Sequence, residues 1–418
     1  MICRPVDNVQ NTGMTSAIEF PAYVIGLMSG TSADGVDAAL LRTDGRGVAE
    51  PIASASMPYA DGLRASILGA MKGEGDRHAI AQELTEIHRD AVEAVIAASG
   101  ISRAQIALIG FHGQTILHRP EEGFSLQIGA PQWLADITGI PVVFDFRSND
   151  IAHGGQGAPL VPLYHAALSE SLEKPLMVIN IGGVSNYTWI GADAALEAAD
   201  CGPGNALLDD WMGMHVGARC DVDGAAARRG IVHEATVKEF LRNSFFVQNR
   251  ARSLDRNAFT LESFFPVSPL DPQERIYRWE AEKKIATMQD GAATLTAITA
   301  AAIGWSVRAV PEIPKRLLVT GGGRHNPVLM RMIKERSGLT VEPVEAVGWN
   351  GDMLEAEAFA YLAARSVQGL PLSLPSTTGV REPVTGGVIY RPTSVAMHHH
   401  HHHDDDDDDS TTPRSCCR

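Results

Sequence analysis

Short apolar runs separated by polar turns mark the first part of the chain. Residues 23–28 are apolar, lead into the polar segment 29–35, and are followed by a second apolar run at 36–41. Two such runs joined by a Gly/Ser/Thr-rich turn predict a β-hairpin. In residues 81–99 apolar positions recur at helical spacing with charges between them, and Gly100 stands where a C-terminal cap would. This pattern predicts a helix.

The same pattern begins again at residue 176. An apolar run, a Gly/Ser/Asn turn and a second apolar run follow one another through residue 190. The remaining expected elements are strands at 106–110 and 316–320, a helix of small residues at 292–303 and a helix beginning at Pro327. Alternating strands and helices predict an α/β fold. The repetition predicts two similar lobes facing one another, with ligands in the crevice between them.

These patterns divide the chain into four expected regions. We expect an N-terminal extension at 1–21, a first lobe at 22–170, a second lobe at 171–392 and a low-complexity tail at 393–418. The lobe boundary should lie near 165–175, and the C-terminal helix is an alternative member of the first lobe. The tail holds six consecutive His and six consecutive Asp residues, which are typical of an expression tag or artefact and not of a metal site.

Composition narrows the class of protein. Of the 418 residues, 44% are hydrophobic and 20% charged, as in globular proteins, and the net charge is -15. An acidic balance argues against a nucleic-acid or anionic-membrane partner. The five cysteines lack metal-ligand spacing, which favours a reducing compartment. With no apolar run of membrane-spanning length and no secretion signal after Met1 or the alternative start Met14, we expect a cytoplasmic protein.

Three glycine-rich turns each follow an apolar strand, at 29–37, 181–186 and 320–326. Glycine lets backbone N–H groups converge on an anion, and Ser or Thr hydroxyls add donors. A single turn of this kind is as well explained by ordinary tight-turn chemistry, but three at strand ends indicate phosphate binding. Neither a P-loop string nor a G-x-G-x-x-G string occurs. P-loop NTPases, protein kinases and nicotinamide-binding Rossmann enzymes are therefore disfavoured.

Longer strings include GLMSGTSADGVD at 26–37, NIGGVSN at 180–186 and DCGPGN at 200–205. In this order they resemble the first phosphate motif, the second phosphate motif and the catalytic motif of one family, the anhydro-N-acetylmuramic acid kinases of the sugar kinase, actin and heat-shock chaperone superfamily. Further similar strings stand in the family's order at 112–115, 126–130, 145–147, 150–162, 253–256, 320–327 and 351–359. The resemblance covers residues 22–392. It implies two ribonuclease-H-like lobes in a duplicated, actin-like ATPase fold with an interlobe cleft.

Two features depart from the family's pattern. Cys201 stands where the family usually has Thr, which removes a hydroxyl beside the presumed catalytic base. Residues 266–289 are longer and more charged than expected at that point. Neither departure touches the core motifs enough to remove the resemblance.

The resemblance implies ATP and Mg²⁺ as cofactors. The first turn would wrap the β- and γ-phosphates, the second would hold phosphate from the other lobe, and the third would let adenosine approach the backbone. Asp34 and Asp37 would hold Mg²⁺ through water; turn capping by Thr31 and Ser32 and a structural role for Asp37 are alternatives. The implied nucleotide contacts are Gly30, Thr31, Ser32, Ala33, Asp34, Gly35, Val36, Asp37, Gly182, Gly183, Gly321, Gly322, Gly323 and Asn326.

The family's substrate carries a 1,6-anhydro bridge, so ring opening by water must accompany phosphorylation of O6. A carboxylate must take a proton from that water. The resemblance implies Asp200 for this role, with capping of the following helix as the alternative. Glu355 is the implied second catalytic carboxylate, with an ordinary helix-surface Glu as the alternative. Gln114, Thr115 and Arg147 would bind sugar hydroxyls and the lactyl carboxylate, and His112 is expected to be structural.

Two other functions are compatible with the same fold. One is another sugar or polyol kinase of the superfamily, which needs no water-activating base. The other is an actin-type structural ATPase, although such a filament gives no reason for the strings at 145–162 and 200–205. The resemblance further implies a homodimer that acts on a small-molecule sugar, without a nucleic-acid or membrane partner.

Overall fold

The computed structural model describes residues 18–242, 285 and 287–393. The string at 253–256, most of the charged segment 266–289 and the His/Asp tail lie outside the described residues. Within the described part, no helix is both long and apolar enough to cross a membrane.

The first sheet joins three antiparallel strands to parallel ones. Its order is β12-β6-β4-β1-β2-β3, with β5 paired to β4. β1 pairs antiparallel with β2 and parallel with β4, and β2 pairs antiparallel with β3. The strands are β1 (Ala22–Ser29), β2 (Gly35–Thr43), β3 (Ala49–Pro58), β4 (Ile106–Arg119), β5 (Phe124–Ile128), β6 (Val142–Phe144) and β12 (Val388–Tyr390).

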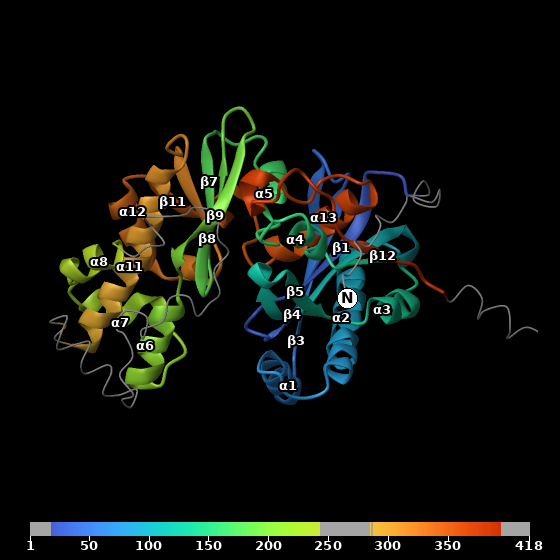
Figure 1. Cartoon of the computed structure of the whole chain (residues 1–418), viewed down its shortest axis with the longest axis horizontal. Coiled ribbons are helices and arrows are strands. Elements are labelled where there is room, and N and C mark those ends of the chain that lie inside the picture. The colour runs from blue at the N-terminus through green and yellow to red at the C-terminus, as the bar shows by residue number, and fades with distance from the viewer. Residues whose placement is uncertain (1–17, 243–284, 286, 394–418) are drawn as a thin grey trace, which may run out of the picture.

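The second sheet repeats this arrangement. Its order is β11-β10-β7-β8-β9, with β7 antiparallel to β8 and parallel to β10. The strands are β7 (Leu176–Ile181), β8 (Val184–Ile190), β9 (Leu196–Pro203), β10 (Arg316–Thr320) and β11 (Thr340–Pro343). The two sheets lie in two lobes side by side along the long axis (Figure 1). The predicted duplicated, actin-like α/β fold is confirmed.

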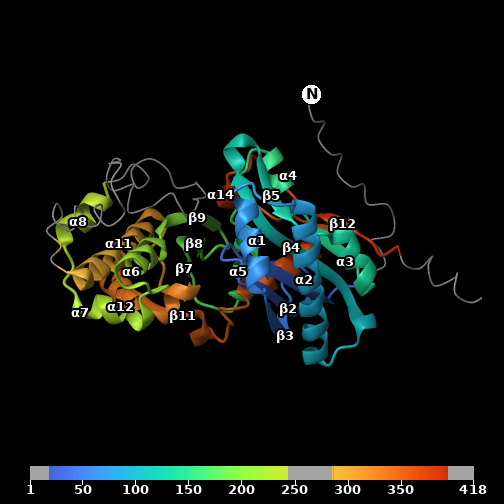
Figure 2. The ribbon, with the colours of Figure 1, turned by 90° about the horizontal axis from the view of Figure 1, so that it is seen from below.

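Helices cover the sheets in both lobes, as the view from below shows (Figure 2). In the first half of the chain they are α1 (Asp61–Met71), α2 (Arg77–Ser99), α3 (Pro131–Thr138), α4 (Ser148–Ala152), α5 (Pro162–Leu168), α6 (Ala206–Val216), α7 (Ala225–Arg229) and α8 (Glu234–Phe240). Later come α11 (Met288–Ala309), α12 (Pro327–Ser337), α13 (Leu354–Val367) and α14 (Pro375–Thr378). The helix expected at 81–99 is confirmed, and Gly100 closes it with a φ of 70°.

Strand β1 shows why α13 belongs to the first lobe. Ile25 and Leu27 join the core beneath α2, while Val24 on the opposite face joins the core around α13. Gly26 also faces α13, since a Cβ there would lie 1.8 Å from the carbonyl oxygen of Ala356. The absent side chain lets the helix backbone lie directly on the strand. The alternative that assigned this helix to the first lobe thus describes its packing.

The chain after α13 also returns to the first sheet. β12 pairs antiparallel with β6, so this strand does not extend the second lobe to residue 392 as we expected. The sequence shows an apolar run but not which sheet edge it joins. A second difference concerns β4, which continues through residue 119 instead of ending near 110. Gly113, with a φ of 76°, carries the strand past β5, where a Cβ would lie 2.6 Å from the Ile128 carbonyl oxygen.

Candidate active site

The β1–β2 turn is held by its backbone and has one open side. The N–H of Ala33 donates to the carbonyl of Gly30 at 3.0 Å, and Ala33 is buried with a φ of 53°. A Cβ on Gly35 would lie 2.3 Å from the Met57 carbonyl oxygen, whereas a Cβ on Gly30 would meet nothing within 4 Å. Gly35 is therefore needed for pairing with β3, and Gly30 marks the side open to a ligand.

The other residues of this turn differ in what they offer. Thr31 and Ser32 are exposed, while Val36 is buried, so only the backbone of Val36 can meet a ligand. Asp34 is exposed and lies 3.3 Å from Nε of Arg64 and 4.0 Å from Nη2 of Arg219. These two guanidinium groups compete with any metal ion for that carboxylate.

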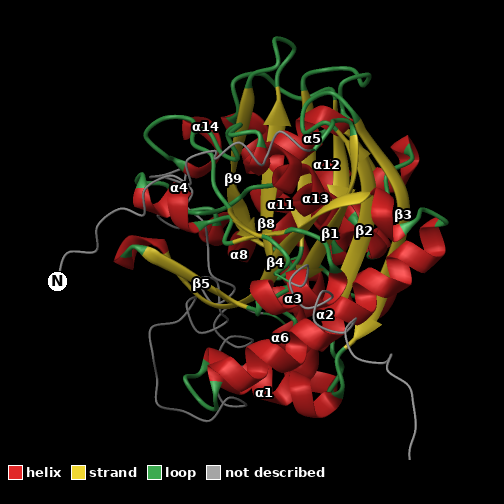
Figure 3. Cartoon of the chain, turned by 90° about the vertical axis from the view of Figure 1, so that its right-hand side faces the viewer, coloured by secondary structure: helices red, strands yellow, loops and turns green. Residues whose placement is uncertain are grey.

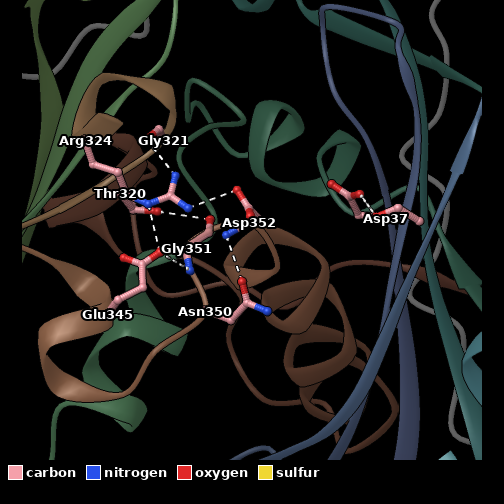
Figure 4. A network of polar contacts seen from close by, with 9 residues as sticks. Asp37, Thr320, Gly321, Arg324, Glu345, Asn350, Gly351 and Asp352 are labelled. Carbon is pink, nitrogen blue, oxygen red and sulfur yellow. Dashed lines mark hydrogen bonds and ion pairs between the residues drawn. The ribbon is translucent and has the colours of Figure 1, made fainter. Parts of the chain in front are cut away.

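Asp37 is the better-placed carboxylate for a cation. It accepts a hydrogen bond from Ser56 Oγ at 2.7 Å. Burial raises the pKa of Asp37, the Ser56 hydrogen bond lowers it, and the negative charge of Asp352 raises it further. Figure 4 shows Asp37 on one side of the site and Asp352 on the other. The described residues contain no cluster of three or more metal-ligating side chains, so Mg²⁺ bound at Asp37 would keep most of its water.

Gln114 supports the first turn with its side-chain amide. It is fully buried, its Oε1 accepts from Ser29 Oγ at 2.5 Å, and its Nε2 donates to the carbonyl of Gly30 at 3.1 Å. The amide that we expected to bind sugar hydroxyls thus also supports the first phosphate turn. Thr115 is half-buried, and its hydroxyl accepts from Gln127 Nε2 at 3.2 Å.

The β7–β8 turn is tied to the start of α6. The carbonyl of Gly182 accepts from the N–H of Asn205 at 2.8 Å, and that of Gly183 accepts from Gly204 and Ala206 at 3.0 and 3.1 Å. A Cβ on Gly204 would lie 2.2 Å from the Gly182 oxygen. The second phosphate motif and the catalytic motif therefore form one structural unit.

Asp200 lies inside β9, paired with Asn186 and only partly buried. The N-cap residue of α6 is Asn205, whose own side chain forms no cap hydrogen bond. Cys201 is buried in the core of the second lobe, where its Sγ donates to Ser185 Oγ at 3.3 Å and burial raises the pKa of the thiol to about 12. A neutral thiol in the core stands apart from cleft chemistry.

The loop after β10, like the first turn, contains glycines in close contact with other elements and one glycine that faces open space. Gly321 has a φ of 81°, and a Cβ there would lie 2.5 Å from Asn180 Oδ1; a Cβ on Gly323 would lie 2.5 Å from the Ile181 side chain. Gly322 is open, with nothing within 4 Å of its Cβ position. Asn326, an expected nucleotide contact, also caps α12, where its Oδ1 accepts two backbone N–H groups.

Arg324 joins this loop to the start of α13 (Figure 4). Its side chain is only 4% exposed. Nη1 donates to the Gly321 carbonyl at 2.8 Å, Nε to Glu345 at 2.9 Å and Nη2 to Asp352 at 2.9 Å. The sequence analysis did not predict a role for Arg324. The residue stands in a glycine-rich string, but its partners Glu345 and Asp352 are distant along the chain and cannot be identified from the string.

Glu355 and Arg147 influence one another electrostatically. Glu355 lies in the first turn of α13, open to solvent yet surrounded by protein groups. Desolvation of the carboxylate by these groups raises the pKa of Glu355, the positive charge of Arg147 lowers it and the negative charge of Asp37 raises it. Burial lowers the pKa of Arg147 to about 10, while Glu355 and Asp150 oppose this shift. Glu355 thus lies near enough to Asp37 and Arg147 for their charges to act on it. His112, expected to be structural, contacts Arg147.

Comparisons with known proteins find relatives that share one name. A relative from Paramagnetospirillum magneticum, named anhydro-N-acetylmuramic acid kinase, is 48% identical over 87% of this chain and 98% of its own length. One of the same name from Rhizorhabdus wittichii is 47% identical, over 88% and 98%. Among solved structures, component A of (R)-2-hydroxyglutaryl-CoA dehydratase from Acidaminococcus fermentans is 15% identical, with a TM-score of 0.44, over 83% of this chain and 99% of that one.

The family model described as anhydro-N-acetylmuramic acid kinase matches residues 22–392. This range coincides with the one covered by the motifs and includes both lobes and the cleft residues. The chain therefore belongs to the anhydro-N-acetylmuramic acid kinase family.

Proposed function

We propose that this protein is an ATP-dependent kinase that opens the 1,6-anhydro ring of 1,6-anhydro-N-acetylmuramic acid with water and phosphorylates O6. The products are N-acetylmuramic acid 6-phosphate and ADP, and the reaction serves cell-wall recycling and amino sugar catabolism in the cytoplasm. The observation that carries the proposal is family membership across both lobes, with the charges of Asp37 and Arg147 acting on Glu355. The buried thiol of Cys201 fits a reducing compartment.

The proposed reaction balances with one water molecule. The water oxygen bonds to C1 as the C1–O6 bond breaks, and Asp200 takes the water proton. O6 then bonds to the γ-phosphorus, and ADP leaves. Asp200 acts as general base, and Glu355 orients the sugar or the water. Arg147 binds the lactyl carboxylate, and Gln114 and Thr115 are the candidates for the sugar hydroxyls.

The nucleotide would be held between the open sides of the two lobes' turns. Backbone N–H groups around Gly30 and Gly182 would meet phosphate, and the open face at Gly322 would meet adenosine. Mg²⁺, when bound, supplies positive charge that neutralises the β- and γ-phosphate oxygens. Asp37 is the residue that fits this ion, because a cation there would relieve the repulsion from Asp352.

Isotope labelling tests the proposed reaction. The protein would be incubated with ATP, Mg²⁺, 1,6-anhydro-N-acetylmuramic acid and ¹⁸O-water, and the products analysed by mass spectrometry. We expect one ¹⁸O atom at C1 of the sugar phosphate and none in its phosphate. Label in free phosphate without a sugar phosphate would show plain ATP hydrolysis and refute the proposal. Phosphorylation of the free sugar alone would favour a simple hydroxyl kinase.

The proposal includes a homodimer, which family resemblance supports. Light scattering coupled to size-exclusion chromatography should give twice the chain mass of 44.8 kDa. A mass equal to one chain would refute this part without affecting the proposed chemistry.

A further inference from the structure

His112 presents one ring nitrogen to Arg147 as a hydrogen-bond acceptor. The imidazole is 3% exposed, and its Nδ1 lies 2.8 Å from the carbonyl oxygen of Gly113. Because a carbonyl only accepts, Nδ1 carries the proton and Nε2 has a free lone pair. Nε and Nη2 of Arg147 lie 3.2 and 3.0 Å from that Nε2. One edge of the guanidinium group is thus held by a neutral histidine.

The surroundings keep this histidine neutral. Burial lowers its pKa well below the usual range, the charges of Arg147 and His88 lower it further, and the Gly113 hydrogen bond opposes them. The group packed on the ring from α13 is Phe359, at a centroid distance of 4.7 Å. An apolar ring on one side and a cation on the other leave the imidazole as an acceptor.

A second fixed acceptor holds Arg147 from the other side. Its Nη1 donates to the carbonyl of Gly157 at 2.8 Å. The N–H of Gly157 donates to Oδ1 of Asp150 at 2.7 Å, and Oδ2 of Asp150 accepts from Ser373 and Thr378, each at 2.5 Å. Asp150 is 2% exposed, so this loop is anchored by a buried, fully hydrogen-bonded carboxylate.

These contacts leave Arg147 with unused donors, and the nearby charges of Glu355 and Asp150 act on it without a direct ion pair. A guanidinium group has five N–H donors, and three of them are used by His112 and Gly157. Among residues 18–242 and 287–393, no carboxylate forms an ion pair with it within 4.0 Å. Two remaining donors and a positive charge match one carboxylate ligand, which arginine binds through two parallel hydrogen bonds.

We propose that His112 is a positioning residue that fixes Arg147 so that its two remaining donors receive the carboxylate of the substrate's lactyl group. His112 does not touch the sugar itself. It fixes the orientation of the guanidinium plane of Arg147, and the guanidinium group binds the carboxylate. The pair thereby determines specificity for an acidic sugar over a neutral one of the same ring. This inference rests on the proposed function and names the part of the site that selects the substrate.

The test compares two ligands that differ only in charge. Calorimetry would measure binding of 1,6-anhydro-N-acetylmuramic acid and of its lactyl amide to wild type and to His112→Leu. In His112→Leu the guanidinium group of Arg147 is no longer oriented to form two parallel hydrogen bonds with the carboxylate. Binding of the acid should therefore weaken by about tenfold to a hundredfold. Binding of the amide should change by less than about threefold, since the neutral group gains less from the cation. ATP affinity serves as the control and should not change.

Two further variants separate positioning from packing. The amide oxygen of His112→Gln can accept from Arg147, so this variant should keep most of the preference for the acid. His112→Asn is too short and should lose that preference as His112→Leu does. Equal weakening of acid and amide in all three variants would overturn the inference and give His112 a packing role. Failure of the wild type to bind either sugar would instead refute the proposed function.

Discussion

Glycines within one motif have different structural roles in this protein. Gly30 and Gly322 face open space, while Gly35 and Gly321 are required by backbone or side-chain atoms of other elements. The sequence identified these strings as phosphate turns, but it could not separate the two kinds of glycine. The difference depends on atoms such as the Met57 carbonyl oxygen, which are remote along the chain. The role of Gln114 in supporting the first turn was missed for the same reason, because its partners Ser29 and Gly30 are known only from the fold.

Asp200→Asn tests the base at this scale. The amide keeps the size of the side chain but cannot accept a proton from water, and a positioned base contributes ~10²–10⁴-fold to such a step. We expect kcat to fall by at least about a hundredfold while both substrates still bind, the pattern of a group that acts in the transition state. Steady-state kinetics with calorimetric affinities would measure this.

Glu355→Gln is the matched control, because Glu355 is expected to orient a ligand. It should raise KM for the sugar more than it lowers kcat. If Asp200→Asn lost sugar affinity at near-normal kcat and Glu355→Gln lost kcat, the two roles would be exchanged.

At the scale of elements, periodicity predicted most strands and helices, because each buries one repeating set of apolar positions. β1, β7 and α2 were found where their patterns placed them. The sequence did not predict which strands pair. β4 continues past residue 110 because it pairs with β5, and β12 returns to the first sheet because it pairs with β6, which is distant in sequence. Helix α13 shows a third feature that the sequence did not predict. Its Glu357 carboxylate is buried where α13 faces α5 and accepts a hydrogen bond from Tyr164 of that helix.

Glu357→Gln should make the protein more resistant to heat at alkaline pH. Tyr164 Oη donates to Glu357 at 2.6 Å, and burial raises the pKa of Glu357 from 4.5 to about 7 although this hydrogen bond lowers it. A raised pKa favours the protonated form in the folded state, so its stabilising contribution is present below pH 4.5 and is lost as the pH rises to about 7. The loss amounts to about 3 kcal/mol.

Thermal unfolding between pH 5 and pH 8 would measure this effect. The glutamine variant, which still accepts from Tyr164, should show a Tm advantage over wild type that grows with pH and levels off above about pH 7. Glu83→Gln, at an exposed position of α2, should show no such trend. A Tm difference that did not vary with pH would show that Glu357 does not titrate in this range.

At the scale of the whole molecule, the two lobes share a core as well as a cleft. Each lobe has its own cluster, with Leu84 buried in the first and Leu295 in the second. A third cluster joins both sheets through α13, and it includes Val24 of β1 and Val178 of β7. The side view shows helices lying against strands throughout this region (Figure 3). Large apolar contacts between lobes couple their unfolding, whereas small polar interfaces leave domains independent.

We therefore expect the lobes to unfold together, and two matched truncations test this. Leu84→Ala and Leu295→Ala each remove a fully buried side chain from one lobe's private core, at a cost of about 2–5 kcal/mol. If the lobes share a core, the whole protein should unfold in a single calorimetric transition, and each variant should lower the midpoint of that transition. Each variant should also reduce the hydrogen-exchange protection of both β1 and β7. If Leu84→Ala reduced protection in β1 only, and Leu295→Ala in β7 only, the lobes would be independent units. Coupled lobes would fix the positions of Asp37 and Asp200 relative to one another, which transfer of a phosphoryl group between two bound substrates requires.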